Sequence, residues 1–385
     1  MEKIVVIGAN EFQLPLILKA RERGYETHVF AWEEGAVAKP FADHFYPISI
    51  TDTDAIYEVC KSIRPAAVTS IGSDLAVVTV NELARRLGLA GNPVSTTLCC
   101  TNKYEMRRVL ADAELPVPGF FRWQPGEDFS AADRLHFPLI VKPTDRSGSR
   151  GVALVREAGE LAAAAEAACA VSFEKKAIIE EFFAGDEFSC EGISQNGEHH
   201  FLTITRKFTT GAPGFIETGH IQPAGLSREL TEKIYTTLDR CLTALGIQNG
   251  ASHSEFRVNG QGELCIMEIG ARMGGDCIGS HLVQLSTGHD FLGYVLDTAL
   301  GLPLCLKPGA EKAAAIRFVF GPEDLAVLDG IRQTSPEALV YVSPMEEGSG
   351  PIRDSSARHG YYIVQCDTAE QADRLCRLSS GKEKA

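Results

Sequence analysis

The chain has 385 residues, of which 44% are hydrophobic and 23% charged, the composition of a globular protein large enough for two or three domains. Its net charge of −14 disfavours nucleic acids and anionic membranes as partners, because both bind basic surfaces. No apolar run is long enough to span a membrane, the first residues lack a signal-peptide pattern, and the eleven cysteines form no Cys-x-x-Cys pair. We therefore expect a cytoplasmic protein without a disulfide framework or a cysteine-bound zinc ion.

Residues 1–95 alternate between short apolar runs and helical segments. Strands are predicted at Lys3–Ile7, Thr27–Ala31 and Ala66–Ser70, and helices at 14–23, 54–63 and 76–87. This alternation is typical of a parallel, doubly wound, Rossmann-like α/β sheet. The glycine after the first strand is not followed by the two further glycines of a dinucleotide fingerprint, so NAD and FAD are not expected.

Ser73 and Asp74 follow the strand at Ala66–Ser70, at the edge where sheets of this kind bind ligands. Two interpretations are open at this point. Either these side chains contact the amine of a substrate, or Asp74 only caps the next helix.

The stretch Gly91-Asn92-Pro93 breaks the pattern and marks a boundary. Thr101-Asn102 then caps a helix that runs to about Ala113, so Lys103 lies in its first turn, where the helix dipole disfavours a cation. An anionic ligand near Lys103 would account for the charge, and an ordinary surface lysine is the alternative.

A strand at 137–141 leads into Lys142, and a strand at 152–155 follows a loop rich in Gly and Ser. The amides of such a loop can fold over phosphates, with Lys142 beside them as a point charge. The loop is not a Walker sequence, because no Gly-Lys-Ser/Thr follows. An ordinary hairpin connection is the alternative.

After an Ala-rich helix at 161–169, residues 177–183 form an apolar strand that ends in carboxylates, with a glycine turn behind it. The backbone of this segment can bind the edge of an adenine, and Glu187 can bind a diol.

Residues 254–270 read as two short strands joined by a Gly-rich turn. A tight loop at 260–263 places Glu255 opposite Glu268, or nearly so, with both side chains on one face. At about 4 Å and an effective dielectric of about 20, their repulsion would be roughly 4 kcal/mol. Magnesium reverses that sign and favours one or two carboxylates plus substrate phosphates. The alternative is a solvated hairpin with its register shifted by one residue.

Arg272 follows this hairpin, where a guanidinium can hold a transferring phosphoryl group or an oxyanion. Gly274 and Gly275 can offer amides to a substrate carboxylate, or only permit a tight turn. Beyond residue 300, strands are predicted at 313–320, 339–343 and 361–366, and a helix at 368–378.

These segments occur in the order and approximate spacing of the ATP-grasp superfamily. The chain resembles its carboxylate–amine ligases, especially the L-amino-acid ligase and biotin-carboxylase-like branch. The resemblance covers nearly the whole chain and implies a mixed α/β and α+β ATP-grasp fold. Its parts would be an N-terminal Rossmann-like pre-ATP-grasp domain (1–95), an ATP-grasp domain of two lobes gripping ATP (96–300), and a small β-rich C-terminal lid domain (301–385).

The resemblance also implies roles for individual residues. Arg272 would stabilise the acyl-phosphate and the tetrahedral intermediate, and Glu255 and Glu268 would bind Mg²⁺ or Mn²⁺. The residues that would bind ATP are Lys103 and Lys142 at the phosphates, Ser147, Gly148, Ser149 and Gly151 in the mobile loop, Glu180 at the adenine amino group, Glu181, Phe182 and Phe183 as hinge backbone, and Glu187 at the ribose.

One position departs from the family pattern. Many members have Asn two residues after the second metal-binding glutamate, and this chain has Gly270 there. The number of metal ions, one or two, is therefore open. The segment 207–224 resembles the substrate-facing part of the amino-acid ligases, in which Glu217 would hold an ammonium and His220 would line the acceptor pocket or act as a structural hydrogen-bonding group.

The activity implied is the joining of a small-molecule carboxylate to an amine through an acyl-phosphate, with ATP converted to ADP and phosphate. An amino acid is the expected substrate. The alternatives are a biotin- or formate-dependent carboxylase or transformylase, and a non-catalytic ATP-binding regulatory module. The chain contains no Met-Lys-Met biotin acceptor sequence. A homodimer is compatible with the resemblance, and neither nucleic acid nor membrane is expected as a partner.

Overall fold

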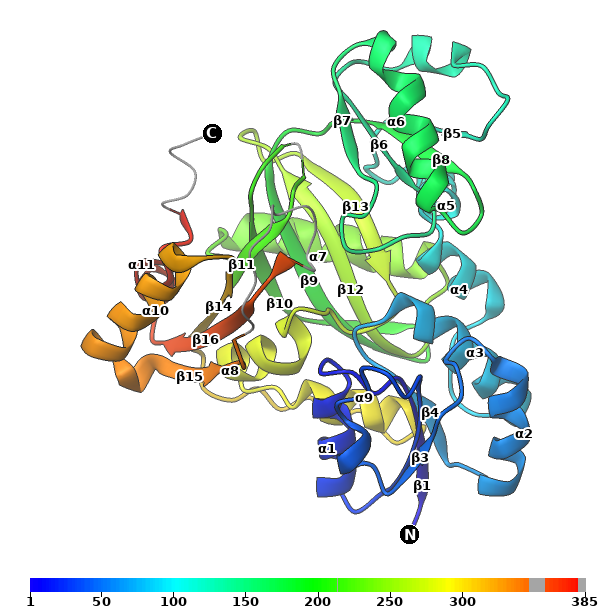
Figure 1. The fold of residues 1–385 in the computed structure, drawn as a ribbon, viewed down its shortest axis with the longest axis vertical. Coiled ribbons are helices and arrows are strands. Elements are labelled where there is room, and N and C mark those ends of the chain that lie inside the picture. The colour runs from blue at the N-terminus through cyan, green and yellow to red at the C-terminus, as the bar shows by residue number, and fades with distance from the viewer. Residues whose placement is uncertain (213, 346–356, 380–385) are drawn as a thin grey trace.

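The computed structural model describes residues 1–212, 214–345 and 357–379. These residues form three sheets with helices on their faces. In Figure 1 the N-terminal sheet lies at the bottom, a small sheet at the top, and the largest sheet between and beside them. Within the described residues, no helix is both long and apolar enough to cross a membrane.

The first sheet contains four parallel strands in the order β3-β2-β1-β4. They are β1 (Lys3–Ile7), β2 (Glu26–Phe30), β3 (His44–Tyr46) and β4 (Ala67–Thr69). On one side lie α1 (Leu14–Glu22) and α9 (Phe291–Ala299), and on the other α2 (Thr53–Ile63) and α3 (Asp74–Leu87) (Figure 1). The predicted parallel, doubly wound sheet is confirmed, and its central strand is buried on both faces.

Two helices, α4 (Val94–Thr101) and α5 (Lys103–Asp112), lead from this sheet to the small sheet. The small sheet is antiparallel in the order β5-β8-β6-β7. Its strands are β5 (Phe120–Trp123), β6 (Leu139–Pro143), β7 (Ala153–Val155) and β8 (Ala177–Glu181). Helix α6 (Ala158–Val171) packs on one face through buried alanines and Leu161. We refer to residues 120–181 as the small lobe.

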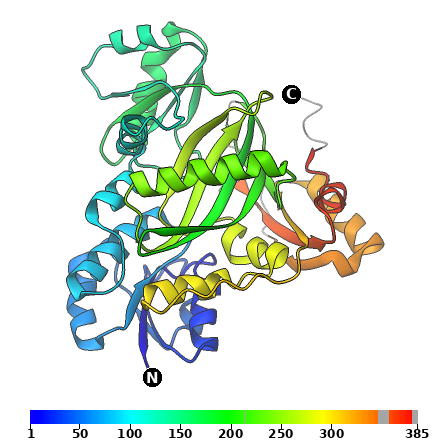
Figure 2. The ribbon, with the colours of Figure 1, turned by 180° about the vertical axis from the view of Figure 1, so that it is seen from behind.

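The largest sheet has eight antiparallel strands in the order β13-β12-β9-β10-β11-β14-β16-β15. They are β9 (Asp186–Gln195), β10 (Glu198–Thr209), β11 (Glu217–Gln222), β12 (Gly250–Val258), β13 (Leu264–Gly270), β14 (Ala313–Val319), β15 (Leu339–Val342) and β16 (Gly360–Cys366). Helix α7 (Arg228–Ala244) crosses one face (Figure 2), burying Ile234 and Leu238 against Phe256 and Ile266. Three further helices are α8 (Val283–Thr287), α10 (Pro322–Thr334) and α11 (Ala369–Cys376).

The sheet continues across residue 300, because β14 pairs with β11 from Gly219↔Arg317 to Gln222↔Ala314. Strands from both sides of the expected boundary therefore share one hydrogen-bonded sheet. The division into domains at residues 95 and 300 stays a prediction.

Several elements were not predicted from the sequence: the strands β3, β5, β9, β10 and β11, and the helices α4, α7, α8, α9 and α10. Strand β3 has only three residues, none of them buried, so it carries no apolar pattern. Helix α4 follows Pro93 without a side-chain cap, so it lacks the usual start signal. Helix α10 follows Gly321, which has no capping side chain, although Pro322 and Asp324 in its first turn were available start signals.

At the boundary predicted at Gly91-Asn92-Pro93, the chain is hydrogen-bonded to the segment just before β12. The Asn92 side-chain oxygen accepts from the amides of Gln248 (2.7 Å) and Asn249 (3.0 Å), and its amide group donates to the Asn249 carbonyl (2.8 Å). Asn92 is 9% exposed, so water does not readily replace these bonds. One side chain thus fixes the end of the N-terminal segment to the start of β12.

Replacing Asn92 by Ala is expected to lower the free energy of unfolding by about 2 kcal/mol, because two backbone amides lose their acceptor. Thermal unfolding of the two proteins measures the change. The matched control is Gln261→Ala in the exposed β12–β13 turn, which is expected to change stability by less than about 0.5 kcal/mol. Equal stability of Asn92→Ala and the wild type would contradict the inference.

Candidate active site

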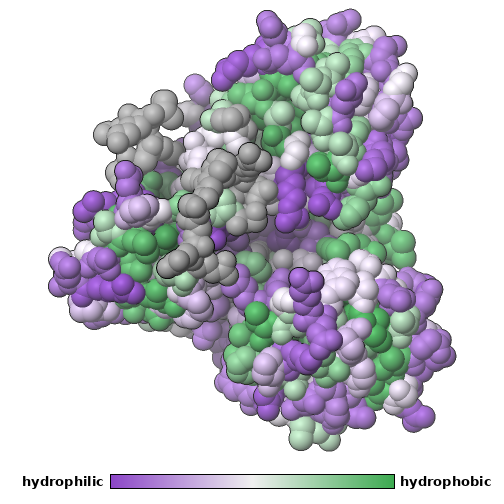
Figure 3. Space-filling view, viewed as in Figure 1, coloured by the Kyte–Doolittle hydropathy of each residue, from purple (hydrophilic) through white to green (hydrophobic). Residues whose placement is uncertain are grey.

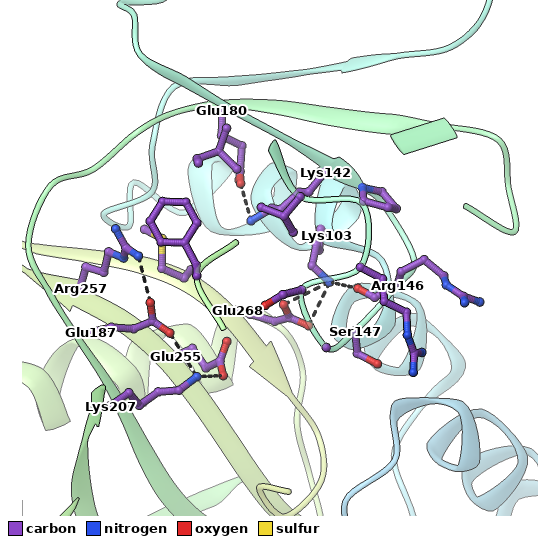
Figure 4. A pocket seen from close by; sticks show the side chains of 18 of the residues that line it. Lys103, Lys142, Arg146, Ser147, Glu180, Glu187, Lys207, Glu255, Arg257 and Glu268 are labelled. Atoms are coloured by element: carbon purple, nitrogen blue, oxygen red, sulfur yellow. Dashed lines mark hydrogen bonds and ion pairs between the residues drawn. The ribbon is translucent and has the colours of Figure 1, made fainter. Parts of the chain in front are cut away.

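A cleft separates the small lobe from the large sheet, and polar side chains from both line it (Figure 4). On the molecular surface the cleft lies in the hollow at the centre of the face shown in Figure 3. The labelled residues that line it are Lys103, Lys142, Arg146, Ser147, Glu180, Glu187, Lys207, Glu255, Arg257 and Glu268. Glu217 and Arg272 line the cleft as well, so the structure brings together residues predicted from five separate segments of the sequence.

Glu255 and Glu268 lie directly opposite each other on β12 and β13. The predicted register is confirmed, and the shifted alternative is wrong. A bulge at Glu255/Phe256 interrupts the ladder immediately beside the pair. Both carboxylates face the cleft (Figure 4), so they present hard oxygen ligands of the kind that Mg²⁺ prefers.

Two buried lysines compensate this negative charge. Lys207 Nζ lies 2.6 Å from Glu255 Oε1 and 3.1 Å from Glu187 Oε1, and Lys103 Nζ lies 3.1 Å from Glu268. Burial by itself would lower the pKa of Lys207, but the surrounding carboxylates outweigh it and hold that pKa well above its ordinary value. Burial likewise works against the charged form of Glu255, yet Lys207 and His253 hold its pKa well below the usual range.

Lys207 was not predicted as a site residue. The available signal was its place on β10 directly opposite Glu187 on β9, which requires the strand register rather than the sequence alone. His253 was also missed. Its ring lies between Glu191 and Glu255, and although burial opposes protonation, these carboxylates raise its pKa to about 9.

Lys103 is buried, with 7% of its surface exposed, so the surface-lysine interpretation is wrong. It is the first residue of α5, which the Asn102 side chain caps as predicted by accepting from the amides of Tyr104 and Glu105. Its Nζ donates to the Arg146 carbonyl at 2.7 Å, which ties it to the start of the Gly/Ser loop.

The Gly/Ser loop connects β6 to β7 and borders the cleft. Gly148, Ser149 and Gly151 have φ of 71°, 57° and 72°, in the left-handed region that favours glycine. Successive backbone amides in such a conformation can face an anion. Ser147 lines the same cleft.

Lys142 and Glu180, which line the cleft, form a buried charge cluster with Arg107. Lys142 Nζ lies 2.5 Å from Glu180 Oε2, while Arg107 Nε donates to Glu180 Oε1 and its Nη2 donates to the Met267 carbonyl. Burial lowers the pKa of Lys142, whereas for Glu180 the two cations outweigh burial and lower the pKa. Arg107 was not among the predicted site residues, although it lies four residues after Lys103 and therefore on the same face of α5.

The segment from Glu181 to Glu187 links the two lobes. The amides of Glu181 and Phe182 donate to the carbonyls of Gly119 and Pro138, and the Phe183 carbonyl accepts from Arg257. Arg257 also binds Glu187 Oε2 at 3.0 Å. The Glu181 carboxylate is turned away to the His136 amide and ring, at 2.9 and 2.7 Å.

Asp74 does not cap α3, as one interpretation of the sequence held. Ser73 is the cap, with its Oγ accepting from the Ala76 amide at 3.2 Å, and Asp74 is the first helical residue. The Asp74 carboxylate instead accepts from Arg272 Nε at 2.7 Å and Nη2 at 3.1 Å. Burial works against the charged Asp74, but this guanidinium lowers its pKa.

Gly270 lies against this ion pair. A Cβ atom at Gly270 would come within 3.3 Å of both Asp74 Oδ1 and Arg272 Nε. The space that an Asn side chain would occupy at position 270 is therefore filled by the side chains of Asp74 and Arg272.

The remaining substrate residues lie around a second charge cluster. Glu217 lies 3.6 Å from Lys207 and 3.2 Å from Arg358, which also binds Asp276 at 2.8 Å. His220 is fully buried, with Nε2 3.7 Å from Asp276. Arg358 and Asp276 were not among the predicted site residues.

The two predicted glycines differ in their surroundings. The Gly274 amide already donates to Glu191 Oε2 at 2.9 Å, so it is not directed at the cleft as a free donor. Gly275 has no heavy atom within 4 Å of where a Cβ would lie.

Comparisons with known proteins agree with this geometry. Residues 135–280 match the family model of the ATP-grasp domain. Alanine–anticapsin ligase of Bacillus subtilis is 30% identical over 271 residues, covering 62% of this chain, which spans only 57% of that relative. D-alanine–D-alanine ligase B of Chromobacterium violaceum is 30% identical over 236 residues, covering 57% of this chain and 75% of that protein.

The crystal structure of an L-amino acid ligase from Bacillus licheniformis has a TM-score of 0.82 at 24% identity, covering 99% of this chain and 98% of that one. The chain belongs to the ATP-grasp family and has its fold along its whole length.

Replacing Arg107 by Ala is expected to lower the free energy of unfolding by about 3–5 kcal/mol, because Glu180 would lose one of its two cations in a buried site. Thermal unfolding measures this. The matched control is the next residue of the same helix, Arg108→Ala, whose exposed pair with Glu105 should leave the unfolding temperature nearly unchanged. If both variants unfold at the same temperature as the wild type, Arg107 does not stabilise the buried Glu180.

Proposed function

We propose that the protein is an ATP-dependent carboxylate–amine ligase that forms ADP and phosphate through an acyl-phosphate. The observation that carries this proposal is the paired carboxylates Glu255 and Glu268, which face Lys103, Lys142 and the Gly/Ser loop across one cleft. The relatives named above are ligases that join amino acids, which supports an amino acid as one substrate.

In this proposal Glu255 and Glu268 hold Mg²⁺ or Mn²⁺. The donor set fits a hard cation, since two carboxylates leave room for phosphate and water oxygens. When bound, the metal would neutralise charge on the triphosphate. Lys207 and Lys103 hold the two carboxylates in place and lower the charge that the cation must balance.

The chain's own groups would position ATP. Lys103 and Lys142 would contact the phosphates, and the amides of Ser147, Gly148, Ser149 and Gly151 would close over them. Glu180 would receive the adenine amino group, the backbone of Glu181–Phe183 would contact the base, and Glu187 would bind the ribose. Because Lys142 and Glu180 form an ion pair, the phosphate end and the adenine end of this site are linked.

The reaction would proceed in two steps. An oxygen of the acid attacks the γ-phosphorus, the bond to ADP breaks, and an acyl-phosphate forms. The amine nitrogen then attacks the acyl carbon, the carbon–oxygen bond to phosphate breaks, and an amide is left. Arg272 would stabilise the negative charge that develops in both steps, and Asp74 fixes the plane of its guanidinium.

For an amino-acid substrate, Glu217 is the proposed partner of the ammonium group, and His220, fully buried beside Asp276, would lie behind the acceptor pocket. Ser73 lies at the start of α3, which packs on the N-terminal sheet, and Gly275 lies three residues after Arg272. The Ser73 hydroxyl is already occupied by the helix cap.

The test is release of ADP and phosphate from ATP and magnesium across pairs of amino acids, with hydroxylamine in a parallel set. We expect ADP formation that depends on one acid, together with its hydroxamate. AMP and pyrophosphate would contradict the proposal. Turnover only with bicarbonate or formate would favour the carboxylase or transformylase alternative, and ATP binding without turnover the regulatory module.

Arg272→Lys is expected to lower kcat about 100-fold while changing the Kd for ATP less than about threefold, because an ammonium cannot keep the two-point contact with Asp74 or the planar donor set. Steady-state kinetics and calorimetric titration with ATP separate the two effects. The control is Arg317→Lys, whose guanidinium binds Asp324 in the C-terminal part. Full activity of Arg272→Lys would refute its assigned role.

A further inference from the structure

A second group of ligand-type side chains lies in the N-terminal sheet, outside the cleft. Glu26 and His28 are on β2, two residues apart and so on one face, and His44 is opposite His28 on β3. One ligand atom from each residue lies within 4.8 Å of the others. Among the described residues this is the one group of three such side chains that converge in this way.

The distances match those between ligands of a metal ion. His28 Nε2 lies 3.0 Å and His44 Nε2 lies 3.2 Å from the same oxygen, Glu26 Oε1. In a tetrahedral zinc site with bonds of about 2.0–2.1 Å, neighbouring ligand atoms are about 3.3 Å apart. Two of the three distances are therefore close to the spacing that one zinc ion requires, and the third is within 4.8 Å.

The surroundings hold these side chains in place. Tyr46 Oη lies 3.0 Å from His28 Nδ1, which directs the other ring nitrogen towards Glu26. The rings of His28 and His44 stack at 4.5 Å, and the ring of Tyr46 stacks beside them. The His28 side chain is 5% exposed and that of His44 is 51% exposed, so a bound ion would keep one open side towards solvent.

The group is separate from the ATP cleft. Glu26 and His44 are the first residues of their strands, at the amino ends of a parallel sheet. Ser73 and Asp74, which reach Arg272, follow β4 at the opposite, carboxyl edge.

The charges around the group are of both signs. Asp43, next to His44, is already bound by the Thr27 amide and hydroxyl and by Arg21, and Lys3 lies opposite Glu26 in the β1–β2 ladder.

From this geometry we infer that Glu26, His28 and His44 form a binding site for one divalent metal ion of the zinc class. Two imidazoles and one carboxylate with an open fourth position are a known ligand set for Zn²⁺. A bound ion would clip the short edge strand β3 to β2.

The test uses the full chain without nucleotide, stripped with a chelator and titrated with Co²⁺ and then Zn²⁺. We expect one Co²⁺ per chain with the visible absorption of low coordination, displaced by one equivalent of Zn²⁺. His44→Ala, at a half-exposed position that leaves the fold intact, should weaken binding more than about tenfold. Circular dichroism confirms that this variant is folded.

Two controls separate this site from others. His200→Ala removes a histidine 3.6 Å from Glu198 that belongs to no three-ligand group among the described residues, and it should bind Co²⁺ as the wild type does. The double variant Glu255→Gln/Glu268→Gln should also retain the ion. Loss of binding in the double variant, a thiolate charge-transfer band, unchanged affinity in His44→Ala, or no stoichiometric binding would each overturn the inference.

Discussion

The cleft between the lobes depends on the direct pairing of two carboxylates, Glu255 and Glu268, across the β12–β13 ladder. Like charges held opposite each other require positive charge nearby, and the protein supplies it with Lys207 and Lys103. Lys103 also holds the Arg146 carbonyl, so the same compensation reaches the Gly/Ser loop. Charge balance therefore connects the large sheet, α5 and the loop, which lie far apart along the chain.

The N-terminal sheet takes part in the cleft through Asp74. Its carboxylate binds Arg272 at two points, in space that a side chain at Gly270 would enter. Gly270, where the family pattern has Asn, thus lies beside the carboxylate of Asp74, a residue about 200 positions earlier in the chain. The pair gives Arg272 a fixed orientation that the hairpin alone would not provide.

The sequence was sufficient to predict the parallel N-terminal sheet, three of the four small-lobe strands (β6, β7 and β8), the hairpin register and the capping of α5 by Asn102. These features follow from local periodicity, turn length and capping residues. It was not sufficient for Lys207, Arg107 or Arg358, because their partners Glu187, Glu180 and Asp276 come from other strands and loops. Asp74 was misassigned for the same reason, since a cap is a local pattern and an ion pair with Arg272 is not.

The pairing of β11 with β14 has a mechanical consequence. Four consecutive residue pairs join these strands, so the C-terminal strands are part of the large sheet and are expected to move together with it. The small lobe has its own sheet, and among the described residues no strand pairing joins it to the large sheet. Any widening of the gap for nucleotide entry is therefore expected to come from a swing of the small lobe about the strand connections at 113–119 and 182–185, while the C-terminal segment stays with the floor of the cleft.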